Sequence, residues 1–160
     1  MRKLLKKIWD NFDDYFAGTL LWIMVTIAFI NVLSRFTFQF SISFIEEIEI
    51  YAYVWLVFFG GAIAFKRWDH LSVSIIVDNF PEKYKKIAYV FVNIVIIIFF
   101  AFMLKYSIDQ VRSQIFMGVR STSLGVPKWW YTLGMPVGSV VIIIRVIERT
   151  INYLKEGGEK

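Results

Sequence analysis

IAYVFVNIVIIIFFAFML, residues 87–104, decides the fold, because it runs for eighteen residues without an ionised side chain. An α-helix needs about 20 apolar residues to cross ~30 Å of hydrocarbon, so this stretch predicts a membrane-spanning helix. Three similar stretches occupy residues 15–34, 44–65 (apolar from 50) and 129–147 (apolar to 144). Lipid cannot satisfy backbone polar groups, so the spans must be helical. The sequence predicts an all-α integral membrane protein, one domain of four transmembrane helices over residues 1–160.

The segment before the first span is amphipathic at helical spacing. Its apolar residues share one face and its charged residues the other: Leu4, Leu5, Ile8, Trp9 and Phe12 against Lys3, Lys6, Lys7 and Asp10. This pattern indicates an interfacial helix lying on the membrane surface. A basic flank continuous with the first span explains it equally well. We expect Asp13 and Asp14 at the level of the lipid headgroups, and a second interfacial helix over residues 71–80.

Composition excludes several classes of function. Hydrophobic residues make up 58% of the chain, which leaves no room for a soluble domain. The absence of Cys excludes disulfide and thiolate chemistry, and one His, His70, cannot supply paired haem ligands. No nucleophile and base stand together in the pattern that catalysis requires. We expect no enzyme activity, no metal site and no cofactor in this chain.

Charge position predicts the orientation. Thirteen Lys and Arg residues fall at the N-terminus, between the second and third spans, and in the C-terminal tail, against five on the opposite side. Cytoplasmic segments carry the excess of Lys and Arg, so both termini and the middle loop are predicted to be cytoplasmic. This distribution accounts for the net charge of +5 without a nucleic-acid partner.

Acidic residues gather where the second span begins. Ser43 and Glu46 form an S-x-x-E capping box, with Glu47 and Glu49 in the following turns, and a helix N-terminus stabilises such anions. A second interpretation pairs Arg35, just past the first span, with Glu46 or Glu47, because charges near hydrocarbon need partners. The two interpretations are compatible.

Small residues interrupt two of the spans. Gly60 and Gly61 lie in the second, while Gly134 and Gly138 give the fourth a small-x-x-x-small spacing that permits close helix approach. Pro136 between them predicts a kink or a freed carbonyl. Arg145 lies at the end of this span. We explain a charge at this position by an i,i+3 pair with Glu148 and by snorkelling of the arginine side chain to the interface.

Residues 105–128 begin as a helical continuation of the third span and then turn. The run of Gly, Ser and Pro residues over 118–127 predicts an ordered external elbow, followed by an aromatic belt at residues 129–131. Arg112 and Arg120 fit either contact with an acidic partner or an anionic substrate, or a position facing solvent or lipid phosphate.

A transporter acting alone needs ionisable groups near mid-membrane. The central turns offer only Thr26, Asn93 and Thr132, and Asn93 is best explained by an interhelical hydrogen bond. These features indicate an accessory or scaffold module for another membrane protein.

Several short motifs carry a family resemblance. They are Asn31-Val-Leu-Ser-Arg-Phe36, Glu46-Glu47, Trp55-Leu-Val-Phe-Phe-Gly60, His70-Leu71, Ser123-Leu-Gly-Val-Pro-Lys-Trp-Trp130 and Met135-Pro-Val-Gly138. In this order and spacing the chain resembles the small membrane subunit of tripartite ATP-independent periplasmic (TRAP) transporters, from about residue 14 to residue 147.

The resemblance implies a scaffold subunit in a bacterial inner membrane, in contact with lipids. Its partners would be a large permease that holds the substrate and sodium sites, and a periplasmic binding protein that delivers an organic anion such as a C4-dicarboxylate or sialic acid. We expect an aromatic and small-residue face to pack on the permease. The interface or helix-locking candidates are Asn31, Arg35, Glu46, Glu47, Trp55, Gly60, Gly61, His70, Arg120, Leu124, Gly125, Pro127, Gly134, Pro136 and Gly138. The alternatives are an autonomous small drug or cation exporter and a purely structural membrane protein.

Overall fold

The computed structural model describes residues 2–38, 43–67 and 82–155. They form five helices: α1 (Arg2–Phe38), α2 (Ser43–Arg67), α4 (Glu82–Met117), α5 (Trp129–Thr132) and α6 (Gly134–Lys155). Four stretches are long and apolar enough to cross a membrane: Asn11–Thr37, Phe44–Lys66, Lys86–Met117 and Trp129–Lys155. The predicted all-α class with four spans is confirmed. His70 and the proposed interfacial helix at 71–80 lie outside the described residues.

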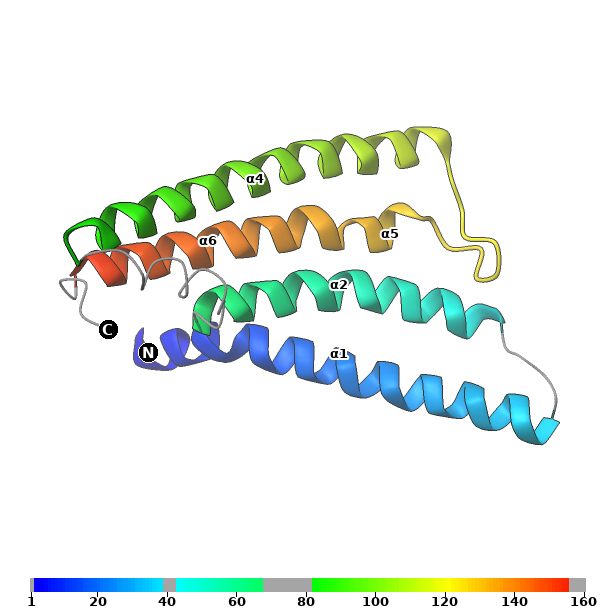
Figure 1. Ribbon diagram of the computed structural model, residues 1–160. Coiled ribbons are helices and arrows are strands. Elements are labelled where there is room, and N and C mark those ends of the chain that lie inside the picture. Colours follow the sequence, from blue (N-terminus) through cyan, green and yellow to red (C-terminus); the bar gives the residue numbers. More distant parts are fainter. Residues whose placement is uncertain (1, 39–42, 68–81, 156–160) are drawn as a thin grey trace.

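The helices lie side by side in one open layer (Figure 1). α1 packs on α2, α2 on α6, and α6 on α4, while α5 lies against both α2 and α4. Within the described helices, α1 packs on neither α4 nor α6, so the layer does not close into a bundle. α6 is central, and 44% of the span that contains it is buried, against 6–11% in the other three.

The two ends of the layer differ. Figure 1 shows the N-terminal end of α1 and the C-terminal end of α6 at the same end, which we call the terminal end. Residues 118–128, the elbow, lie at the opposite end, which we call the elbow end. α4 extends to Met117, so the predicted helical continuation of the third span is confirmed.

The N-terminal segment is part of α1. This helix runs without a break from Arg2 to Phe38. Of the two interpretations of the N-terminal segment, the basic flank continuous with the first span therefore agrees with the backbone. A helix of 37 residues is about 55 Å long at ~1.5 Å per residue, longer than the hydrocarbon thickness of ~30 Å. The excess length places part of α1 outside the hydrocarbon.

Glycines in α6 allow α2 to approach closely. A Cβ built on Gly134 would lie 3.2 Å from the Trp55 ring, and one on Gly138 would overlap Phe58, with its Cγ 2.7 Å away. A Cβ built on Gly61 of α2 would lie 3.4 Å from Ile142 Cδ1 of α6, which is ordinary contact. The predicted close helix approach is therefore confirmed, and it joins two helices of this chain. Gly134 and Gly138 act here as helix-locking residues, and the small-residue face expected to pack on the permease stays a prediction.

Pro136 accounts for the break between α5 and α6. Proline has no N–H to bond the carbonyl four residues earlier, which here belongs to Thr132. α5 ends at Thr132 and α6 begins at Gly134. The Val137 N–H donates to Leu133 O at 3.1 Å. The predicted local disruption of the fourth span is confirmed.

A small apolar core joins α6 to α2 and α4. Ala62, Ile142 and Val146 are buried at its centre, surrounded by partly buried side chains from all three helices. Phe65 of α2 meets Phe100 of α4 edge to face, with ring centroids 5.9 Å apart. α1 joins the layer through a separate aromatic contact, in which the Phe16 and Phe59 centroids lie 4.5 Å apart.

Gly138→Ala tests the α2–α6 contact. We expect it to destabilise the detergent-solubilised chain by about 1–3 kcal/mol, because the added methyl group must displace Phe58. Gly60→Ala is the matched control, since no atom lies within 4 Å of a Cβ built there. Thermal unfolding of both variants measures the difference, and equal midpoints would contradict the close contact.

Candidate functional site

Glu47 holds the elbow against the start of α2. Its carboxylate accepts hydrogen bonds from three successive backbone N–H groups, those of Thr122 at 3.1 Å, Ser123 at 3.1 Å and Leu124 at 3.0 Å. The Ser121 hydroxyl donates a fourth. Hydrogen bonds to an ionised carboxylate are stronger than those between neutral groups. One side chain thereby fixes a loop more than seventy residues away in the sequence.

This arrangement corrects the predicted role of Glu47. Among the described residues, no ion pair joins Arg35 to Glu46 or to Glu47. Glu47 points to the elbow, while Glu46 is exposed, as is Arg35 in the last turn of α1. The sequence suggested Arg35 because opposite charges attract. Three preorganised N–H groups satisfy the carboxylate without a cation.

The elbow is ordered, as predicted. Ser121 N–H donates to Val126 O at 2.8 Å and Lys128 N–H to Val119 O at 2.9 Å, which closes the loop on itself. Gly118 and Gly125 adopt φ of 62° and 66°, a region that favours glycine because it lacks a Cβ. Arg120 Nη1 reaches Gly125 O at 3.4 Å, so this cation contributes to the turn.

An apolar groove of about 440 Å³ opens beside the elbow. It is lined by residues of α2, the elbow and α5: Ile48, Tyr51, Ala52, Trp55, Val126, Pro127, Trp130 and Tyr131. Two of the lining residues, Tyr51 and Tyr131, stack with ring centroids 4.0 Å apart. The elbow, its partner Glu47 and the groove thus bring together six of the predicted interface residues: Glu47, Trp55, Arg120, Leu124, Gly125 and Pro127.

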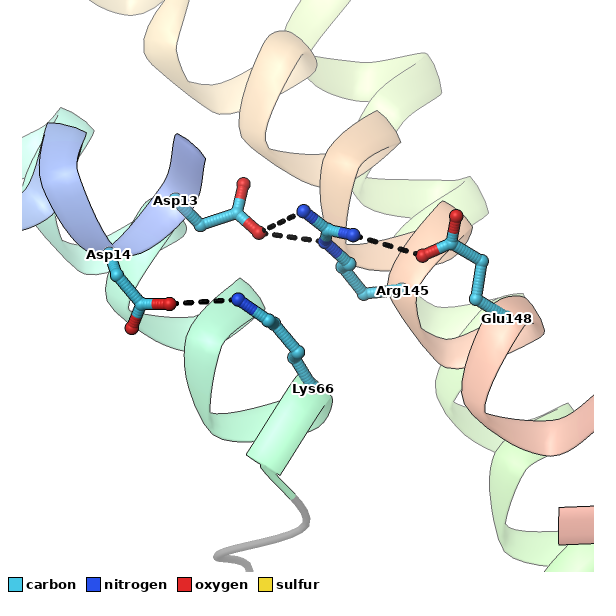
Figure 2. A network of polar contacts seen from close by, with 5 residues as sticks. All are labelled: Asp13, Asp14, Lys66, Arg145 and Glu148. Atoms are coloured by element: carbon cyan, nitrogen blue, oxygen red, sulfur yellow. Dashed lines mark hydrogen bonds and ion pairs between the residues drawn. The ribbon is translucent and has the colours of Figure 1, made fainter. Parts of the chain in front are cut away.

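A network of charges crosses the terminal end (Figure 2). Asp13 Oδ2 accepts from Arg145 Nε at 2.7 Å and Nη2 at 2.5 Å, and Arg145 Nη1 lies 3.0 Å from Glu148 Oε2. Beside it, Lys66 Nζ lies 2.8 Å from Asp14 Oδ2. The Asp13 and Arg145 side chains are only 2–3% exposed. The network joins α1 to both α2 and α6.

One expectation is corrected here. Arg145 does not snorkel, because its side chain is buried against Asp13. The expected level of Asp13 relative to the lipid headgroups stays a prediction, because burial against Arg145 does not fix depth in the membrane. The predicted i,i+3 pair of Arg145 with Glu148 is confirmed. A signal was present in the sequence, since the charge rule places both Asp13 and Arg145 at the cytoplasmic ends of their spans. Opposite charges at one level in separate spans are candidates for a pair.

Two of the three polar residues expected in the central turns bond carbonyls one turn earlier in the chain. The Thr26 hydroxyl donates to Trp22 O at 2.8 Å, and the Thr132 hydroxyl donates to Lys128 O at 3.2 Å. In residues 2–38, 43–67 and 82–155, no group of three or more His, Asp or Glu residues could hold a metal ion. Asn93 is buried, and its Nδ2 has no hydrogen-bond partner in this part of the chain. The interhelical hydrogen bond expected of Asn93 is not made by that atom.

The remaining candidates are dispersed. Asn31 lies partly buried in α1, and Gly60 has open space beside it, so neither joins the groups at the elbow or terminal end. Gly61, Gly134, Pro136 and Gly138 shape the α2–α6 packing.

Comparison with known protein families identifies the family of this chain. Residues 24–156 match the model for the DctQ component of tripartite ATP-independent periplasmic transporters. The chain belongs to this family. The DctQ family comprises subunits of transporters rather than enzymes, so the resemblance given by the sequence motifs is confirmed.

Similar curated proteins are named as TRAP transporter permease proteins. A TRAP transporter small permease protein of Haemophilus influenzae is 28% identical, with 98% of this chain and 93% of the relative covered. The sialic acid TRAP transporter small permease protein SiaQ of Vibrio cholerae is 22% identical over 96% and 87%. In SiaT, the sialic acid TRAP transporter permease protein of H. influenzae, 90% of this chain matches only 23% of a longer polypeptide at 22% identity.

Arg145→Met tests the buried network. It leaves the Asp13 carboxylate buried without a counter-charge, so we expect a loss of roughly 3–5 kcal/mol of stability. Asp13→Leu combined with Arg145→Met should recover most of this loss, because neither charge remains. Glu148→Gln is the control: this partner is 45% exposed, and we expect at most about 1 kcal/mol. Thermal unfolding reports all three, and equal midpoints for Arg145→Met and Glu148→Gln would refute the assignment.

Glu47→Gln tests the elbow. The neutral amide loses the charge that the three N–H groups stabilise, so amide hydrogen exchange at Thr122, Ser123 and Leu124 should become faster. Glu46→Gln changes an exposed neighbour and should leave exchange as in the parent chain. Unchanged exchange in the Glu47 variant would show that the loop holds its shape unaided.

Proposed function

We propose that this DctQ-family chain is the static scaffold on which the large permease subunit of a TRAP transporter is mounted. The observation that carries the proposal is the open layer. Within the described helices the linear order α1, α2, α6, α4 encloses no interior, and a transport pathway normally lies between helices near mid-membrane. Such a chain supplies a wall, and a second membrane protein supplies the pathway.

Exposed apolar side chains on the outer helices support this assignment. Trp22 of α1 is 71% exposed, and Phe91 of α4 is 65% exposed. Membrane helices bury such side chains against lipid or against other spans. A single layer offers two broad faces, so one can meet the permease while the other remains in lipid.

Fused relatives support the choice of partner. SiaT and the isethionate TRAP transporter permease protein DctMQ of Oleidesulfovibrio alaskensis each match this chain over less than a quarter of their length. The family therefore pairs with a large permease, in some members within one polypeptide. We propose that in this case the two associate as separate chains in a bacterial inner membrane, with the terminal end cytoplasmic and the elbow end periplasmic.

The transported substrate in this proposal is an organic anion. Relatives are named for sialic acid and for C4-dicarboxylates, and we propose a substrate of this kind, taken up with sodium and delivered by a periplasmic binding protein. The substrate and sodium sites would lie in the large permease. On this chain, exposed Arg35 and the elbow held by Glu47 would form the periplasmic docking surface.

Co-purification tests the scaffold role. A tag after Lys160 and gentle solubilisation of native membranes should recover a large multi-span permease in a fixed ratio, identified by mass spectrometry. Arg35→Ala should lower permease recovery or anion uptake, while Arg112→Ala, at another exposed arginine, on α4, should lower neither.

Two results would count against the proposal. If the tagged chain purifies alone from membranes with intact uptake, the scaffold role fails. If the isolated chain transports drugs or cations in liposomes, the autonomous exporter replaces it. If Arg35→Ala and Arg112→Ala give equal permease recovery and equal uptake, Arg35 is not part of the docking surface. This result would leave the scaffold role itself unaffected.

A further inference from the structure

One side of α2 presents a regular and largely exposed stripe of residues. α2 lies between α1 and α6, so its two remaining sides belong to the broad faces of the layer (Figure 1). On one of these sides, six residues follow one another at alternating spacings of four and three, and we call them the α2 stripe: Glu46, Ile50, Tyr53, Val57, Gly60 and Ala64. Ile50, Tyr53 and Val57 are 49–58% exposed, and no atom lies within 4 Å of a Cβ built on Gly60.

The spacing of the α2 stripe is that of a seam between two helices. Residues that alternate at four and three share one face of a helix, and a second helix packs along such a face. Gly60 and Ala64 have the small-x-x-x-small spacing that lets membrane helices approach closely. Gly134 and Gly138 of α6 have the same spacing, and side chains of α2 fill the room beside them. The room beside Gly60 is open, so the stripe offers a seam that the described helices leave without a partner.

A groove with two carboxylates opens at the elbow end of the stripe, between α1 and α2. Its volume is about 380 Å³, and it is lined by one residue of α1 and five of α2: Met24, Glu46, Glu49, Ile50, Tyr53 and Val54. Among the described residues, neither Glu46 nor Glu49 forms an ion pair. The Oε1 atom of Glu49 is shielded from water and has no hydrogen-bond partner there. The groove is therefore anionic and lacks a counter-charge within this part of the chain.

The position of Glu49 makes a missing counter-charge costly. The span Phe44–Lys66 has 23 residues, about 35 Å at ~1.5 Å per residue, against ~30 Å of hydrocarbon. Glu49 lies five residues inside this span, about 7.5 Å along the axis. Carboxylates within membrane spans face other protein groups and pair with them. A cation placed in the groove would pair with Glu49 and lie beside Glu46.

Charge argues against a second copy of this chain as the occupant. Two copies in one membrane have the same orientation, so a symmetric contact through the stripe would bring Glu46 and Glu49 of both copies to one level. Like charges facing each other across an interface cost several kcal/mol. A metal ion is not favoured either, because the described residues contain no group of three acidic or His side chains that could hold one. A Lys or Arg on a membrane helix of another protein supplies both the cation and the helix.

We propose that the large permease packs on the α2 stripe and places a Lys or Arg side chain of one of its helices in the groove at Glu46 and Glu49. This inference rests on the scaffold role proposed above, and it adds the face and the chemistry of the contact. The permease helix lies along the stripe and comes closest to the backbone of α2 at Gly60.

Photo-cross-linking in native membranes tests the face. A photoreactive amino acid replaces Val57 in the tagged full chain. Ile48 is the control position, because it lies nine residues earlier, on the opposite side of the same helix, and lines the other groove. We expect a permease adduct from Val57 and none from Ile48. With the photoreactive group at Ile50, the cross-linked permease peptide should contain Lys or Arg.

Gly60→Leu tests the close approach. The larger side chain should hold the permease helix away from α2 and lower the co-purified permease about tenfold. Gly18→Leu is the matched control on α1, since a Cβ built on Gly18 also meets no atom within 4 Å. Both variants have room for leucine within the chain and should unfold at the temperature of the parent. Undiminished permease recovery with Gly60→Leu, or equal losses in the two variants, would overturn the seam.

Glu49→Gln tests the charge. Loss of the carboxylate should lower permease recovery about tenfold, as expected for a charge-assisted contact near hydrocarbon. Asp109→Asn removes an exposed carboxylate from α4 and should leave recovery unchanged. Equal recovery with Glu49→Gln and the parent chain would overturn the cation in the groove.

The remaining outcomes separate this inference from the scaffold role. If the permease co-purifies but cross-links from Ile48 and not from Val57, the face is wrong and the scaffold role stands. An adduct of Val57 with a second copy of this chain would overturn the choice of partner. Recovery of the permease without any protein adduct at Val57 would leave the stripe to lipid and overturn the inference. If no permease co-purifies with the parent chain, the scaffold role itself fails, and the inference fails with it.

Discussion

The buried pair of Asp13 and Arg145 is the interaction on which the arrangement of the helices most depends. α1 packs on α2 alone, yet the carboxylate of Asp13 reaches the guanidinium of Arg145 on the central helix. Each charge is shielded from water and requires the other, because an unpaired charge at this depth is far more costly than the pair. The position of α1 along α2 is thereby fixed: sliding by one turn, about 5.4 Å, would separate the two groups.

A second carboxylate has a corresponding role at the opposite end of the layer. Glu47 binds three backbone N–H groups of the elbow, which connects the start of α2 to the segment between α4 and α5. Between these two ends, Gly134 and Gly138 bring α6 against the aromatic side chains of α2. The layer is therefore joined at both ends by charge and at its middle by close packing. A rigid wall of this kind suits the scaffold role proposed for this member of the DctQ family.

Particular elements show how far the sequence predicted the structure. The spans were found because residues such as 87–104 are apolar throughout, and the elbow because Gly118, Gly125 and Pro127 favour turns. The close approach at Gly138 was also predicted, but its partner Phe58 was not. Spacing along one helix shows which residues share a face. It does not show which other helix covers that face, and for this reason the sequence left open whether the small residues lock helices of this chain together or meet a partner.

Hydrophobicity, charge position and turn residues thus determined by themselves that the chain is helical and crosses the membrane four times. The order and spacing of short motifs added the resemblance to small TRAP subunits. The tertiary structure alone decided that the helices form an open layer, that Glu47 binds backbone amides instead of Arg35, and that Arg145 is buried against Asp13. The physical reason is the separation along the chain over which each interaction acts. Span formation depends on the transfer of local segments into lipid, whereas pairing of charges depends on which distant segments meet, and several pairings satisfy the same local pattern.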